Sequence, residues 1–130
     1  MNTPQRDTKE SEFSKILAAI EDSCNGFETI VFFDSEGETI DYHSCIDPYD
    51  TRLTAAYLGV VISSAIYRFN FLELGDVKYM EFVSDKKEIL TVSIGDDLFV
   101  GLVLKAGSLT KEVYTAMDAL IVTLRMEVGI

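Results

Sequence analysis

The segment from His43 to Cys45 places the only histidine of the chain beside a hydroxyl and a thiol, the side chains that nucleophilic catalysis uses. Successive residues of a strand point to opposite faces, so the His43 and Ser44 side chains are not expected to meet. We interpret His43 as a surface histidine. Cys24 and Cys45 form no CxxC pair, and one histidine with two separated cysteines cannot complete a four-ligand metal site. The sequence therefore predicts ordinary buried thiols, no catalytic residue and no metal site.

Charged residues offer two further kinds of chemistry. Arg52 is the one arginine whose position suggests that it could reach a nucleotide held by another protein, but we interpret it as a solvated helix charge. Asp47, Asp50, Asp96 and Asp97 lack the spacing of a calcium-binding loop and are interpreted as turn formers. No glycine-rich phosphate loop occurs, so we expect no bound nucleotide or other cofactor.

The composition limits the classes of partner. A chain of 130 residues with 48% apolar residues fits a single domain, which we place at residues 11–130 after a flexible tail at residues 1–10. The net charge of −11 repels phosphate backbones and anionic lipids, which argues against nucleic acid and membrane surfaces as partners. The tail, MNTPQRDTKE, lacks the apolar core of a signal peptide, so we expect a cytoplasmic protein.

The hydrophobic pattern predicts the order helix, two strands, helix, three strands, helix. We expect Asp50 or Thr51 to cap the second helix and Ser108 to cap the last one. The predicted helices run from Phe13 to Cys24, from about Thr51 to Leu74 and onward from Leu109, and the predicted strands are Phe27–Asp34, Thr39–His43, Val77–Val83, Glu88–Ile94 and Leu98–Lys105.

Strand burial can be inferred from the same pattern. Phe27–Asp34 and Leu98–Lys105 are apolar on both faces, so we expect them to be central and adjacent, with Thr39–His43 and Val77–Val83 as edges. The first and last helices have one apolar stripe each and can share one face of the sheet, which leaves the long second helix for the other face.

The long helix is apolar on two opposite sides, and a single sheet can cover only one of them. Exposing the other would forgo several kcal/mol, which is comparable to the net stability of a small domain. The uncharged run Leu53–Tyr67 is shorter than the about 20 residues that a membrane span needs. We expect a second copy of the chain to cover the free side; a cover made by loops or by the N-terminal tail is the alternative. One side carries Leu53, Tyr57, Val60, Tyr67 and Phe71, and the other carries Ala55, Leu58, Ile62, Ile66 and Phe69.

The element order, the hairpin FDSEGETIDY at Phe33–Tyr42 and the helix LTAAYLGVVISSAIYRF at Leu53–Phe69 together resemble the roadblock family over about Phe13 to Val128. The family includes dynein light chains, lysosomal scaffold subunits and bacterial MglB-like regulators of Ras-like GTPases, and the bacterial branch is the most similar. The resemblance implies a profilin-like α+β sandwich with a five-stranded antiparallel sheet. It also implies a homodimer in which third strands pair edge to edge and second helices pack together.

The resemblance further implies a non-enzymatic regulator that binds a Ras-like small GTPase and changes its GTP hydrolysis or nucleotide state. A scaffold or adaptor subunit without effect on catalysis, and a domain that senses a small ligand, are the alternatives. The residues expected in the dimer interface are Leu58, Gly59, Ile62, Ser63, Ala65, Ile66, Phe69, Val77, Tyr79 and Glu81. Those expected to contact the partner protein are Tyr49, Asp50, Arg52, Thr54, Tyr57 and Arg68.

Overall fold

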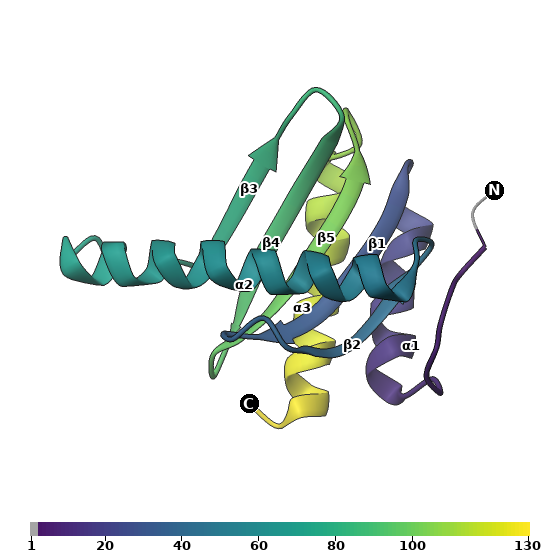
Figure 1. Cartoon of the computed structure of the whole chain (residues 1–130), viewed down its shortest axis with the longest axis horizontal. Coiled ribbons are helices and arrows are strands. Elements are labelled where there is room, and N and C mark those ends of the chain that lie inside the picture. The colour runs from purple at the N-terminus through teal and green to yellow at the C-terminus, as the bar shows by residue number, and fades with distance from the viewer. Residues whose placement is uncertain (1–2) are drawn as a thin grey trace.

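A computed structural model describes residues 3–130 as three layers, with the sheet between two groups of helices (Figure 1). Helices α1 and α3 cover one face of the sheet and α2 crosses the other face, which confirms the predicted order and layers. The elements are α1 (Glu12–Ala18), a 3-10 helix η1 (Ala19–Ser23), β1 (Phe27–Asp34), β2 (Thr39–Ser44), α2 (Pro48–Phe71), β3 (Tyr79–Val83), β4 (Lys87–Gly95), β5 (Leu98–Lys105) and α3 (Lys111–Val128).

The five strands pair in the order β2-β1-β5-β4-β3, and every pairing is antiparallel. The predicted neighbours β1 and β5 lie at the centre, with Ile30 opposite Leu102. The Ile30 and Leu102 side chains are fully buried because helices cover both faces of the sheet. Strands β2 and β3 form the two edges, as their sequences indicated.

Three details of the predicted helices were wrong. The N-cap of α2 is Asp47, whose carboxylate accepts the Tyr49 N–H at 2.8 Å, because Pro48 occupies the first helical position, where its missing N–H costs nothing. The N-cap of α3 is Thr110 and not Ser108. The first helix changes to 3-10 geometry at Ala19 instead of continuing to Cys24.

The underside of α2 closes the smaller of two hydrophobic clusters. Ala55, Leu58 and Ile62 pack onto side chains of β1, β2 and β5, including Phe33 and Phe99.

Within residues 3–130, no helix combines the length and the hydropathy that crossing a bilayer requires.

Gly59 lets the turn between β1 and β2 approach α2 closely. A Cβ added at Gly59 would lie 2.6 Å from the Gly37 Cα, so no side chain fits between the two backbones. Gly59, which we expected in the dimer interface, therefore packs against a turn of its own chain.

Candidate functional site

Helix α2 is longer than the sheet is wide, and its C-terminal end projects past β3 (Figure 1). Ile62 and Phe69 lie on the same side of the helix, yet Ile62 is 1% exposed and Phe69 is 39% exposed. The difference arises because the sheet lies beneath Ile62, whereas Phe69 lies near the outer edge at β3. The same apolar stripe that packs on the sheet thus continues beyond it without cover from residues 3–130.

The outer side of α2 carries an apolar row, which we call the outer row: Leu53, Tyr57, Val60, Tyr67 and Phe71. The exposed fraction of these side chains rises from 39% at Leu53 to 76% at Phe71. Residues 3–10 reach α2 at Arg52 and leave the outer row exposed, so the alternative in which loops or the tail cover this side is wrong for the described chain.

Strand β3 adds a second exposed apolar surface. Its Tyr79, Phe82 and Val83 are all exposed, although strand residues of this type usually pack. A groove between α2 and β3 is lined by Val61, Phe82 and Val83 on their facing sides. The bare edge of the sheet and the projecting helix therefore form one continuous apolar surface.

The predicted interface residues divide into two groups. Leu58, Gly59 and Ile62 are buried against their own sheet, and the Ser63 hydroxyl donates a hydrogen bond to the Ser35 carbonyl at 2.8 Å. We correct the expectation for Leu58, Gly59 and Ile62, because they are buried within the subunit; Ser63 is half-buried, and its place in the interface stays a prediction. The others lie along α2 and β3 near the sheet edge: Ala65, Ile66, Phe69, Val77, Tyr79 and Glu81. Sequence reasoning missed Val61, Leu72, Phe82 and Val83 at this surface.

Among the predicted partner contacts, Tyr49 and Tyr57 are well exposed on α2. The Thr54 hydroxyl donates to the Asp50 carbonyl at 2.9 Å, and Arg68 donates to the Ser64 side chain, so Thr54 and Arg68 are engaged within the helix.

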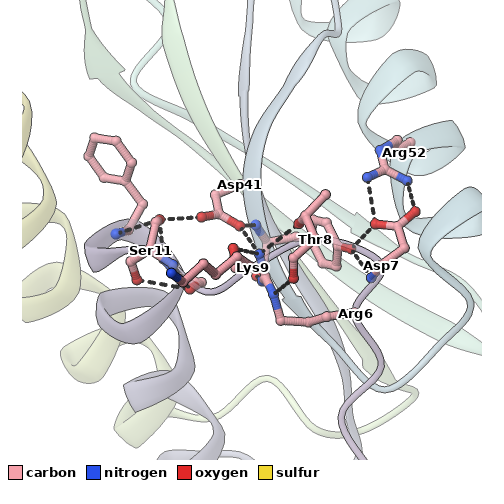
Figure 2. Close-up of polar contacts among 10 residues, drawn as sticks. Arg6, Asp7, Thr8, Lys9, Ser11, Asp41 and Arg52 are labelled. Atoms are coloured by element: carbon pink, nitrogen blue, oxygen red, sulfur yellow. Dashed lines mark hydrogen bonds and ion pairs between the residues drawn. The ribbon is translucent and has the colours of Figure 1, made fainter.

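Arg52 is not a free solvated charge. Its guanidinium donates two hydrogen bonds to the Asp7 carboxylate, at 2.7 and 2.8 Å, and lies over the Tyr42 ring (Figure 2). The Tyr42 hydroxyl donates to the same carboxylate at 2.7 Å. Arg52, followed by Tyr42, holds the pKa of the Asp7 carboxyl well below its usual range.

Residues Gln5 to Lys9, which we call the N-terminal strap, lie along the outer edge of β2. The Gln5 N–H donates to the Ser44 carbonyl at 2.8 Å, and Arg6 donates to the Tyr42 carbonyl and to the Asp41 carboxylate. The strap thus occupies carbonyl groups that an edge strand would otherwise offer to another strand.

The candidate nucleophiles are held apart. His43 Nε2 lies 2.6 Å from Glu21 Oε1 and its ring stacks on Phe27, so His43 is mostly covered and is not the surface histidine that we expected. The Ser44 hydroxyl instead bonds to Thr51 at 2.7 Å. No group of three His, Cys, Asp or Glu side chains within residues 3–130 could hold a metal ion.

Cys24 is expected to react slowly with alkylating reagents. Burial, followed by the charges of Glu21 and Glu112, raises the pKa of its thiol from 9.0 to about 11. A rise of this size lowers the thiolate fraction at pH 8 by roughly 100-fold, and the thiolate is the reactive form. Iodoacetamide labelling, followed by peptide mass spectrometry, should be at least about tenfold slower in native than in urea-unfolded protein. The native rate should climb as the pH approaches 11. Cys24 is half-buried and not fully buried as the sequence predicted; equal rates at pH 8 would contradict the raised thiol pKa.

Comparison with known proteins relates this arrangement to solved structures. No protein-family profile and no curated protein sequence matches the chain. The structure of a Roadblock/LC7 domain from Streptomyces avermitilis superimposes with a TM-score of 0.82 at 15% identity, covering 92% of this chain and 100% of that one. MglB of Myxococcus xanthus gives a TM-score of 0.78 at 13% identity, covering 92% of this chain and 98% of that one. An MglB with a tetrameric arrangement gives 0.73 at 9% identity, covering 88% of each chain. The likeness confirms, at the level of fold, the resemblance that the sequence indicated.

Proposed function

We propose that this chain, which has the roadblock fold, is a non-enzymatic homodimeric regulator that binds a Ras-like small GTPase and changes its GTP hydrolysis or nucleotide state. The observation that carries the proposal is the uncovered apolar surface made by β3 and by α2 on both its sides. The choice of a GTPase as partner depends on the roadblock resemblance and not on the surface alone.

The first step of the proposal is self-association at β3. When β3 of a second copy pairs with β3, the sheet of that copy extends beneath the projecting end of α2 and covers Phe69. A two-fold axis gives both copies this cover at once. The solved MglB with a tetrameric arrangement supports self-association in this fold.

The second step is partner binding at the outer row. Most of this row lies on the side of α2 away from the sheet, so it stays exposed when β3 and the underside of α2 are covered. Tyr57 also lines the groove between α2 and β3. Exposed tyrosines such as Tyr57 and Tyr67 are of a residue type that often dominates protein–protein binding energy, and the aliphatic side chains around them help to exclude water. Contact with a GTPase can change its activity by positioning the groups of the GTPase itself, so the regulator needs no nucleophile.

Replacing Val60 with aspartate is expected to weaken GTPase binding at least about tenfold, because the substitution places a charge in the middle of the apolar outer row. Val60 is 68% exposed, so folding and dimerisation should not change. The measurement is calorimetric titration with the Ras-like GTPase of the same genome, together with GTP hydrolysis rates.

The matched control is Val122→Asp on α3, which is 60% exposed and lies on the opposite side of the sheet. Equal affinity of the Val60→Asp variant and the wild type would remove the outer row from the interface. If no Ras-like GTPase of the genome binds the wild-type dimer, the GTPase proposal itself fails. Binding without any change in hydrolysis or nucleotide release would favour the scaffold alternative.

A further inference from the structure

The N-terminal strap joins two elements that are separate in sequence. It lies along β2 and then reaches the first turns of α2 through Asp7 (Figure 2). Arg52 directly precedes the exposed Leu53, which is the N-terminal member of the outer row. At Asp7 the strap therefore borders the proposed partner surface.

Asp7 occupies the end-on fork of the Arg52 guanidinium, which is formed by its two Nη groups. Within the described residues, both hydrogen bonds that the Arg52 side chain donates go to the two Asp7 oxygens. A guanidinium presents its N–H groups in a planar fork that matches a carboxylate. A partner carboxylate that approaches the two Nη groups end-on would use the same fork, so in this geometry it competes with Asp7 for Arg52.

The contact between Asp7 and Arg52 is suited to such exchange, whereas the Arg6–Asp41 ion pair of the strap is largely buried, with side chains 14% and 8% exposed. The side chains of Asp7 and Arg52 are 49% and 41% exposed, so water reaches this ion pair and limits its strength. The strap contributes no apolar side chain to either hydrophobic cluster. Its main chain donates to a β2 carbonyl at Gln5, and its other strong contacts are ion pairs and side-chain hydrogen bonds.

We propose that the strap is an autoinhibitory contact: Asp7 occupies in cis the site at which Arg52 binds a carboxylate of the partner protein. This inference rests on the proposed function, because the partner surface that includes Arg52 is the one proposed for the GTPase. In the closed state Arg52 is withheld, and only the fraction of molecules with an open strap binds through it. The apparent affinity is therefore the intrinsic affinity multiplied by the fraction of molecules with an open strap.

The first test measures the strap without any partner. Asp7→Asn removes the charge that Arg52 binds, and Glu10→Gln makes the same charge change at an exposed position next to the strap. Amide hydrogen exchange should accelerate at Gln5 and at residue 7 in the Asp7→Asn variant, because these two N–H groups donate to Ser44 and Tyr42 in the closed strap. Glu10→Gln should leave their exchange unchanged. Unchanged exchange in Asp7→Asn would show that Asp7 does not hold the strap, and would overturn the inference.

The second test is a double-mutant cycle on GTPase affinity. Asp7→Asn should bind about three- to tenfold tighter than the wild type, since freeing Arg52 removes the closed fraction. In an Arg52→Gln background the same substitution should have no effect, because there is no guanidinium to release. Equal effects of Asp7→Asn in both backgrounds, or no effect in either, would overturn the inference while the proposed function stands. Failure of the wild type and of every variant to bind a GTPase would instead overturn the proposed function and the strap's role with it.

Discussion

Replacing Phe69 with aspartate is expected to convert the proposed dimer into a folded monomer of 14.5 kDa. Phe69 belongs to the stripe that packs on the sheet, but it is 39% exposed because it lies at the outer edge of the sheet, beside the segment that begins β3. In the proposed dimer, the sheet of the second copy covers this side chain, so a carboxylate there would be buried without a partner. We expect dimer dissociation to become at least 100-fold more favourable, which corresponds to about 2.7 kcal/mol. Light scattering coupled to size-exclusion chromatography measures the change.

The control for this experiment lies two residues further along the same helix. Phe71 is 76% exposed on the outer side of α2, so Phe71→Asp introduces the same charge without entering the proposed dimer interface. It should remain a dimer. A wild-type protein that is monomeric at high concentration, or a Phe69→Asp variant that still dimerises like the wild type, would refute this arrangement of the two copies.

Replacing Ile62 with aspartate should abolish folding and not merely dimerisation. Ile62 is 1% exposed and packs in the cluster that contains Val31, Phe33 and Phe99. An unpaired charge at such a site costs several kcal/mol, which is comparable to the whole stability of a small domain. Circular dichroism should show loss of the native signal or a large fall in the melting temperature.

Val60→Asp provides the matched control, because the same side chain is introduced two residues earlier on the exposed side of α2. Its melting temperature should stay within a few degrees of the wild-type value, as expected for a surface substitution. If Ile62→Asp instead gave a stable folded monomer, Ile62 would face a second subunit, as the sequence alone had suggested.

The elements and their layers could be predicted because hydrophobic periodicity and turn residues report them directly. The N-cap of α2 could not be assigned with the same certainty, since Asp47, Asp50 and Thr51 are all good N-cap residues. The structure selects Asp47, because the proline that follows it fits the first helical position.

The interface was only partly predictable, for a physical reason. A helical wheel identified two apolar sides of α2, but it contains no information about which side the chain's own sheet covers. Leu58, Gly59 and Ile62 were therefore placed toward a second copy, whereas they pack within the subunit. The partner of Gly59, the turn at Gly37, is known only once the hairpin has been placed over the helix.

The strap contacts lay beyond sequence reasoning. The tail MNTPQRDTKE is polar and without periodicity, which is the pattern of a flexible segment. Asp7 forms an ion pair with Arg52, which is 45 residues away in the sequence, and such a contact cannot be predicted from local sequence patterns. Arg52 was consequently interpreted as a solvated charge.

The two rims of the sheet are finished differently, and this difference bears on how many copies can join. The edge at β2 is covered by Gln5 and Arg6, which donate hydrogen bonds to the Ser44 and Tyr42 carbonyls, and the edge at β3 is left unpaired. A subunit with one unpaired sheet edge can pair with one other copy, whereas a subunit with two such edges could add copies without limit. The residues that cover β2 therefore favour a closed dimer over an open-ended polymer.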